Sequence, residues 1–342
     1  ATEKEPNDQT EQASVLAADG LTINARFDKS GDVDIYAVKL VAGQTLVAAL
    51  ESNFTLGKPA DATLQVLNER GFVVAHNDDA RGLDPLIVFP VTQPGTYYVR
   101  TFCFPATPNT VIRYAGGADY VYRLTLTAGP YVDHVQPLGV AADPSAAIQP
   151  YGWNLADLPT LKTTEIPGAA DRVAVFQAGA AGALQLPREP HAVRVEEEPN
   201  STPDQAEAVS WPISISGTIG EPGDVDIYRF TAAKGDNLSF AAESWKRGYE
   251  LDVHLTLTDS SGTKLKEIDD TVRNEREAEL VHRFAADGEY LLHVRDLYGH
   301  GGLRYPYLLR ITPSAPSFTL AVPADRYVLS ADKPLEIPVT IA

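Results

Sequence analysis

The first residues of the chain carry side chains that can coordinate a hard cation. Four oxygen-bearing side chains stand close together: Glu3, Glu5, Asn7 and Asp8. In an extended segment alternate side chains share a face, so several of these oxygens point the same way. Asp32 and Asp34 add two carboxylates at the start of a predicted strand. Because calcium takes about six to eight oxygen ligands in irregular geometry, this spacing indicates a calcium site.

The same pattern occurs again in the second half of the chain, at Glu196, Glu198, Asn200, Asp224 and Asp226. Ser201 stands where the first copy has Asp8, so we expect the first copy to bind a cation more tightly. Acidic runs at domain edges are often only solvated, and an Asp before a strand often serves a turn. That alternative stays open at this point.

Both clusters belong to a longer internal repeat. The segment Gly-Asp-Val-Asp-Ile-Tyr occurs at residues 31–36 and again at 223–228. A turn glycine followed by an Asp pair, at Asp78-Asp79 and Asp269-Asp270, and then a Gly-x-Tyr segment recur in the same order. We interpret the Asp pairs as hairpin residues. A repeat of this length indicates a duplicated domain.

The elements that position these residues are predicted to be β-strands. Apolar and polar residues alternate, for example at Val253, Leu255 and Leu257, and a period of two is typical of half-buried strands. Turns are predicted at residues 68–71 and 259–262, where Asn or Asp opens and Gly closes. The pattern predicts an all-β chain of tandem antiparallel β-sandwiches, jelly-roll or immunoglobulin-like, with a small β domain between them.

These patterns divide the chain into four segments. We predict β-sandwiches over residues 1–129 and 195–314, each able to fold independently, and a small immunoglobulin-like β domain over 130–194. The middle segment is too long for a linker in a compact protein. Residues 315–342 are predicted to begin a further immunoglobulin-like domain, because two strands cannot close a core alone.

Composition narrows the possible functions. The chain has 342 residues and a formal net charge of −18, which disfavours nucleic acid and anionic membrane surfaces as partners. A single cysteine, Cys103, excludes an intramolecular disulfide and is expected to be buried. No apolar run reaches the roughly 20 residues of a membrane span. The chain holds no methionine, even at position 1, and we expect a secreted or cell-surface protein from which a signal peptide has been removed.

The sequence gives little sign of the residue motifs that are typical of enzyme active sites. The histidines show no HExxH spacing, and there is no Gly-x-Ser-x-Gly segment and no phosphate-binding glycine loop, so we expect no enzyme activity. Abundant carboxylates leave a glycosidase pair open, although the obvious acids belong to the repeat. Tyr36 and Tyr228 are predicted to pack in the core with the hydroxyl on a polar partner. Four aromatic residues offer a sugar-stacking platform, although core or rim packing is their more ordinary role: Trp153, Trp211, Trp245 and Tyr249.

The repeat resembles the bacterial pre-peptidase C-terminal domain, a β-sandwich appended to secreted peptidases and cell-surface proteins. The resemblance rests on the Glu-Pro-Asn openings at residues 5–7 and 198–200, the Gly-Asp-x-Asp-x-Tyr segments, the turn glycine before Asp-Asp, and the late Gly-x-Tyr strand. The repeat is also similar to the calcium-binding, collagen-binding domains of clostridial collagenases. That similarity implies bound Ca²⁺, held by Glu3, Glu5, Asn7, Asp8, Asp32 and Asp34 in one copy and by Glu196, Glu198, Asn200, Asp224 and Asp226 in the other. The middle segment, through residues 135–139 and 152–155, resembles an immunoglobulin-like IPT/TIG module.

The resemblance implies a non-catalytic, calcium-stabilised, secreted or cell-surface bacterial protein whose modules act as spacers, in adhesion or in matrix binding. The alternative is an ancillary substrate-binding segment of a larger secreted peptidase or glycoside hydrolase. The expected partner is an extracellular polymer or surface protein, collagen-like or a polysaccharide, without nucleic-acid binding or membrane insertion.

Overall fold

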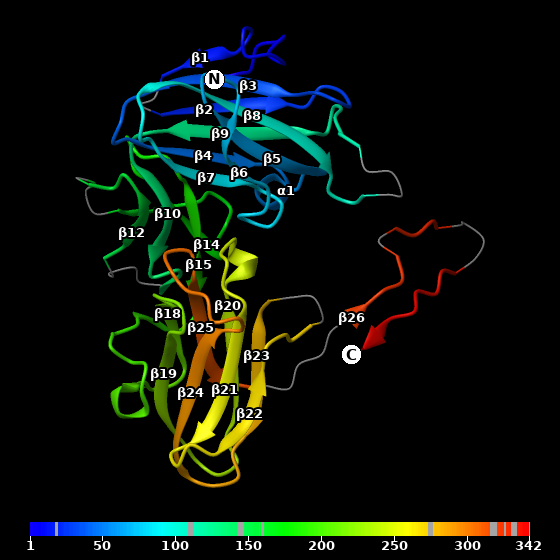
Figure 1. The fold of residues 1–342 in the computed structure, drawn as a ribbon. Coiled ribbons are helices and arrows are strands. Elements are labelled where there is room, and N and C mark those ends of the chain that lie inside the picture. Colours follow the sequence, from blue (N-terminus) through cyan, green and yellow to red (C-terminus); the bar gives the residue numbers. More distant parts are fainter. Residues whose placement is uncertain are drawn as a thin grey trace.

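Two β-sandwiches occupy the ends of an elongated molecule, and a smaller β domain lies between them (Figure 1). The computed structural model describes residues 1–17, 20–108, 113–141, 147–156, 158, 161–272, 276–314, 320–324, 326–329 and 334–341. The all-β prediction is confirmed, since helices are limited to short turns such as α1 (Asn53–Leu56) in the described ranges. In those ranges no helix is long and apolar enough to cross a lipid bilayer.

The first sandwich consists of two sheets around one core. One sheet has the order β1 (Ser14–Leu16), β3 (Asp34–Leu40), β8 (Gly95–Pro105), β5 (Ala60–Leu67) and β6 (Val73–Asn77). The other has the order β2 (Leu21–Arg26), β9 (Val121–Thr127), β4 (Thr45–Glu51) and β7 (Leu86–Pro90). Every second residue of β5 is buried through most of its length, as the period of two predicts. Cys103 is fully buried in this core, as expected.

The second sandwich repeats this topology. One sheet has the order β17 (Glu207–Ala208), β19 (Val225–Ala232), β24 (Gly288–Asp296), β21 (Val253–Asp259) and β22 (Lys264–Ile268). The other has the order β16 (Ala192–Val195), β18 (Ile213–Thr218), β25 (Pro306–Pro313), β20 (Asn237–Glu243) and β23 (Ala278–Arg283). The short 3-10 helices are η1 (Pro203–Gln205) and η2 (Trp245–Arg247). From β17 onward each strand has its counterpart in the first sandwich, in the same sheet position.

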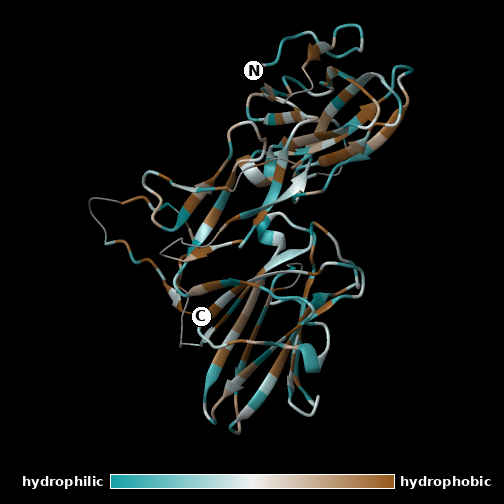
Figure 2. Ribbon diagram, turned by 90° about the vertical axis from the view of Figure 1, so that its left-hand side faces the viewer, coloured by the Kyte–Doolittle hydropathy of each residue, from teal (hydrophilic) through white to brown (hydrophobic). Residues whose placement is uncertain are grey.

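The predicted turns lie where the repeat places them. Gly71 N–H donates to Asn68 O at 2.9 Å, and Gly262 N–H donates to Asp259 O at 3.0 Å. Both glycines have positive φ, 78° and 85°, which a side chain would disfavour. Figure 2 shows brown apolar residues alternating with teal polar ones along the sandwich strands. The two turn predictions are therefore confirmed.

The middle domain is smaller. It contains β10 (Tyr131–Gln136) paired with β12 (Gln149–Trp153), and a sheet of β11 (Val140–Ala141), β15 (Leu184–Glu189), β14 (Arg172–Val175) and β13 (Thr163–Glu165). Its core is built from short apolar side chains: Val132, Val135, Val140, Ile148, Leu161, Val173, Val175 and Leu186. The membership of this domain in the immunoglobulin-like class stays a prediction.

The C-terminal segment extends away from the sandwiches in Figure 1. Its described part contains a two-residue pairing of β26 (Leu320–Ala321) with β27 (Thr340–Ile341), and Leu320 and Ile341 are largely exposed. Residues 315–319, 325, 330–333 and 342 of the predicted further domain lie outside the described residues. That a further domain begins here stays a prediction.

All three domains meet around one buried carboxylate. Asp133 of β10 is fully buried, and its Oδ1 accepts hydrogen bonds from Arg81 of the first sandwich (2.8 Å) and Arg304 of the second. The Arg304 guanidinium also donates to Ala80 O at 2.9 Å, so it bridges the two sandwiches directly. Burial alone would raise the pKa of Asp133, but the two arginines and His134 outweigh it and hold the pKa well below the ordinary value. Asp133 is therefore ionised and paired at neutral pH.

A second ion pair joins the middle domain to the second sandwich. Arg310 of β25 binds both oxygens of Glu189 at 2.8 Å each, and Ser214 donates to Glu189 Oε2 at 2.8 Å. Glu189 is buried, and such a bidentate pair fixes orientation as well as distance. Together with the Asp133 cluster, this contact makes the three domains one packed unit.

Candidate metal centres

The first candidate centre forms where the N-terminal segment lies on the sandwich. Glu3 N–H donates to Asn24 O of β2 at 3.2 Å, and Ile35 N–H of β3 donates to Asn7 O at 3.1 Å. These bonds hold the acidic segment across the start of β3, where Asp34 lies. As a result, carboxylate oxygens of Glu3, Glu5 and Asp34 lie within 4.8 Å of one another.

The second centre has the same construction. Glu196 N–H donates to Ser216 O of β18 at 3.0 Å, and Ile227 N–H of β19 donates to Asn200 O at 3.2 Å. Here the carboxylate oxygens within 4.8 Å belong to three residues: Glu198, Asp224 and Asp226. Glu196 lies against Asp226, but its Oε1 accepts the Thr218 N–H at 2.6 Å.

Each centre contains buried oxygen atoms that have no hydrogen-bond partner among the described residues. They are the side-chain oxygens Oδ1 of Asn7, Asp34, Asn200 and Asp226. All four residues are fully buried. A buried acceptor left unpaired costs about 1–3 kcal/mol, so such atoms rarely occur without an unseen partner. Carboxylate oxygens that lie this close together, with buried oxygens beside them that lack donors, fit a hard cation such as Ca²⁺.

The electrostatics agree with this fit. Burial, and then the charge of Glu3, raises the pKa of Asp34 to about 9. Burial, and then the charge of Glu196, raises the pKa of Asp226 to about 10. Burial also raises the pKa of Glu196 to about 7. In the cation-free chain, each centre therefore keeps a proton that a divalent cation would displace.

The other residues considered as ligands lie outside the three-carboxylate groups or at their edge. Asp32 is buried, but its Oδ2 accepts the Asp28 N–H at 2.5 Å. Asp8 is half-buried and lies outside the three-carboxylate group of the first centre. Ser201 O–H donates to Asp224 Oδ1 at 3.1 Å, which places this hydroxyl beside the second centre. The tighter binding expected of the first copy stays a prediction.

A buried tyrosine pair supports each centre, and the sequence identified only one member of each pair. Tyr122 O–H donates to Asp34 Oδ2 at 2.6 Å, and the Tyr36 and Tyr122 hydroxyls are 2.8 Å apart. The second copy repeats this: Tyr307 O–H donates to Asp226 Oδ2 at 2.6 Å, and its hydroxyl lies 2.6 Å from that of Tyr228. The sequence carried a signal for them, because Tyr122 and Tyr307 stand at matching positions, second in the last strands of the two sandwiches, β9 and β25.

We expect Tyr122→Phe to weaken cation binding at the first centre by about tenfold, because the hydroxyl fixes one Asp34 oxygen and leaves the other free for the cation. The unpaired Asp34 oxygen should also lower the free energy of unfolding by about 1–3 kcal/mol. Calorimetry with calcium and denaturant unfolding measure the two effects. Tyr97→Phe is the matched control, because Tyr97 O–H donates to Gln93 O far from the carboxylates. Equal losses of affinity in the two variants would contradict the supporting role.

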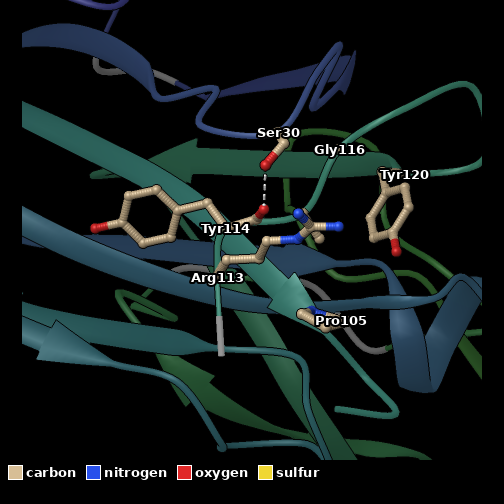
Figure 3. A pocket seen from close by; sticks show the side chains of 7 residues that line it. Ser30, Pro105, Arg113, Tyr114, Gly116 and Tyr120 are labelled. Carbon is tan, nitrogen blue, oxygen red and sulfur yellow. Dashed lines mark hydrogen bonds between the residues drawn. The ribbon is translucent and has the colours of Figure 1, made fainter. Parts of the chain in front are cut away.

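A separate cavity in the first sandwich contains a serine but, among the described lining residues, no base to activate it. Figure 3 shows this cavity of about 220 Å³, lined by Ser30, Pro105, Arg113, Tyr114, Ala115, Gly116 and Tyr120. The Ser30 hydroxyl donates to Tyr114 O at 2.6 Å. Among the described lining residues none offers a carboxylate, imidazole or thiol as a base, so the serine is not activated here.

The candidate sugar-stacking residues do not form one platform. Trp153 packs on Tyr131, Trp211 Nε1 donates to the Thr231 carbonyl, and Tyr249 is buried. Trp245 differs, because it lines a cleft between the two sandwiches.

Comparison with known proteins gives one family. The model of the bacterial pre-peptidase C-terminal domain matches residues 32–101, from β3 into β8, and residues 224–296, which hold β19 to β24. A probable subtilase-type serine protease of Deinococcus radiodurans is 28% identical over 243 residues, covering 69% of this chain and 26% of that protein. The chain thus spans about a quarter of the length of this curated relative.

Two solved structures show more distant likeness. The pre-peptidase C-terminal domain of a Bacillus anthracis collagenase is 16% identical, with 36% of this chain and 98% of that chain covered and a TM-score of 0.24. Tandem CBM51 modules of a Streptococcus pneumoniae family 98 glycoside hydrolase are 10% identical, with 85% and 83% covered and a TM-score of 0.23. Neither likeness is close enough to bear on function. The two family-model matches and the duplicated topology agree: residues 32–101 and 224–296, at corresponding positions of the two sandwiches, each match the bacterial pre-peptidase C-terminal domain.

Proposed function

We propose that the chain is a non-catalytic ancillary segment of a secreted protein, stabilised by calcium at both centres and attached to an extracellular polymer. The observation that carries the calcium proposal is the duplicated set of buried oxygens without partners, around Asp34 and around Asp226. A single set of unpaired buried oxygens could arise from local packing alone. Two sets, at matching positions of two domains, favour a shared ligand.

At each centre the residues come from two separate elements. Glu5 and Glu198 lie on the entering segments, whereas Asp34 and Asp226 lie on β3 and β19. A bound calcium ion would neutralise these carboxylates and stabilise the folded chain by mass action. In the second copy Glu198 follows β16, the first strand of the second sandwich, so a cation there would tie this segment to β19 within that sandwich.

A second, narrower candidate is favoured by the curated relative. Its name describes a subtilase-type serine protease, and the chain covers 26% of it. We therefore propose that this segment accompanies a secreted peptidase and serves attachment to substrate or matrix. A subtilase catalytic domain in the same precursor supports this candidate, and a precursor without any hydrolase domain contradicts it.

Calcium titration of the full chain by calorimetry tests the cation centres. We expect two binding events, of which Asp34→Asn abolishes one and Asp226→Asn the other. Asp119→Asn is the control, because this aspartate is exposed and lies outside both centres. The proposal fails if the chain gives no binding heat, or if Asp34→Asn and Asp226→Asn titrate like Asp119→Asn.

A further inference from the structure

A cleft of about 600 Å³ lies between the two sandwiches, away from both metal centres. The first sandwich contributes Asn53 at the start of α1 and Asp79 after β6. The second contributes the remaining polar and aromatic lining: Trp245, Glu250, Asp252, Arg276, Asp296, Tyr298, His300 and Tyr305. The volume falls within the usual range of ligand sites, about 300–1,000 Å³.

The two walls of the cleft are held in place. Phe54 of α1 packs so closely on Gly248 that a Cβ there would lie 3.1 Å from its ring. Arg304 donates to Ala80 O in the first sandwich and to Gly248 O in the second, at 2.9 and 2.7 Å. Figure 1 shows α1 facing the adjoining end of the second sandwich. The cleft is therefore part of the packed junction.

Aromatic rings follow one another along the wall formed by the second sandwich. The ring centroids of Tyr298 and His300 are 6.2 Å apart, and those of His300 and Tyr305 are 6.4 Å apart. Tyr298 is 72% exposed, which is high for a tyrosine that lines a cleft. Asp296 is buried and accepts the Tyr298 and His300 N–H groups at 2.9 Å each, so it fixes the loop that carries these rings. An exposed ring on a fixed loop is prepared for contact with a ligand.

The polar groups of the cleft include both signs of charge. The Arg276 guanidinium lies 4.1 Å from the centre of the Trp245 ring and 4.0 Å from Asp252. Asp252 Oδ1 is buried and has no hydrogen-bond partner among the described residues. Glu250 is already paired with Arg304 at 2.9 Å. Asn53 Nδ2 already donates to Lys58 O at 2.6 Å, so one of its two N–H bonds remains. The groups left for a ligand are therefore this N–H and the Arg276 guanidinium, together with carboxylate acceptors.

These groups disfavour a charged ligand of either sign. A cationic side chain would meet the Arg276 guanidinium, which already lies over the Trp245 ring. An anionic polymer would meet Asp79 and Asp252. An uncharged polyhydroxyl ligand avoids both conflicts, because its hydroxyls donate to the carboxylates and accept from Arg276 while its C–H faces pack on the aromatic rings.

We propose that the cleft between the sandwiches binds a neutral glycan, with Tyr298 and Tyr305 as stacking rings and Asp252 and Arg276 as hydrogen-bonding groups. Asn53 and Asp79 complete the site from the first sandwich, so binding needs both sandwiches in place. None of these residues belongs to a metal centre, and the glycan site can fail or hold independently of calcium binding.

Calorimetry of the full chain against neutral oligosaccharides of glucose, N-acetylglucosamine, xylose, mannose and galactose tests this site. We expect at least one of these oligosaccharides to bind, and Tyr298→Ala to weaken that binding by about tenfold or more. Asp79→Asn, on the opposite wall, should weaken it as well. Both residues are exposed, so these variants are expected to fold. Tyr114→Ala is the control, since Tyr114 is a 40% exposed tyrosine outside the cleft.

The other ligand classes are outcomes of the same experiment. A short lysine peptide and a heparin oligosaccharide serve as the cationic and anionic probes. Binding of either charged probe, without binding of any neutral oligosaccharide, overturns the proposal. So does neutral-glycan binding that Tyr298→Ala leaves unchanged, or that Tyr114→Ala weakens equally.

Discussion

Chelation of calcium is expected to destabilise the chain far more at about pH 8 than at about pH 5. Without a cation, burial and the neighbouring glutamate raise the pKa of Asp34 to about 9, from an ordinary value of 3.8. Burial and Glu196 raise the pKa of Asp226 to about 10 in the same way. At pH values between the ordinary pKa of 3.8 and these raised pKa values, the folded chain holds a proton at each centre that the unfolded chain releases. Stability is therefore lost as the pH rises through this window, by about 1 kcal/mol per pH unit for each retained proton.

Bound calcium should remove this dependence, because the ligands are then held as carboxylates and no proton is needed. Melting temperatures with calcium and with a chelator, at the two pH values, measure the difference. Calorimetry in buffers of different ionisation enthalpy should show protons released on calcium binding, and an affinity that rises with pH. The Asp34→Asn, Asp226→Asn double variant is the control, and chelation should affect it little at either pH. An effect of chelation that is equal at both pH values contradicts the prediction.

Replacing Asp133 with alanine should have the largest effect of any single substitution at the junction. The change leaves Arg81 and Arg304 without their shared carboxylate in a buried position. Breaking a buried ion pair by removing one partner costs about 3–5 kcal/mol. Denaturant unfolding should show this loss, and small-angle X-ray scattering should show a longer, less compact molecule. Limited proteolysis should cleave the middle domain faster.

Two further variants separate this effect from a general loss of charge. Asp171→Ala removes an exposed carboxylate of the same domain, paired with Arg172, and should cost less than about 1 kcal/mol. Adding Arg81→Met to Asp133→Ala removes the charge that the first change leaves without a carboxylate, because Arg304 keeps its ion pair with Glu250. That double variant should recover part of the stability, so the two effects are not additive. Strict additivity, or an Asp171→Ala loss as large as that of Asp133→Ala, would show that the buried cluster does not hold the domains together.

The duplication made much of the fold predictable. The same segment preceding the same strand in two copies identified β3 and β19 and, with them, Asp34 and Asp226. The period of two then placed the core face of strands such as β5. These inferences rest on residues close together in the chain, where local spacing decides which side chains share a face.

The contacts between elements were not predictable in the same way. Tyr122 meets Asp34 because the two sheets of the sandwich face each other, although 88 positions separate the residues. Asp133 and Arg304 are 171 positions apart and belong to different domains. No periodicity connects such residues, since their meeting depends on how whole domains pack. The sequence could name the acidic residues of the centres, but not the hydroxyls that orient them or the ion pairs at the junction.

The position of β16 has a mechanical consequence. β16 runs parallel to β18, with Ala192 opposite Ile213 and Val195 opposite Ser216, and it is the strand through which the chain enters the second sandwich. Ile311 of β25 lies opposite Ile213, so the chain enters β16 and leaves β25 at the same end of this sheet. Tension between the middle domain and the C-terminal segment would therefore peel β16 from β18, starting at Ala192 and breaking one hydrogen bond at a time. Glu198 follows the far end of β16, so the force would reach the second centre last, and a tether built in this way would lengthen first at its domain boundary.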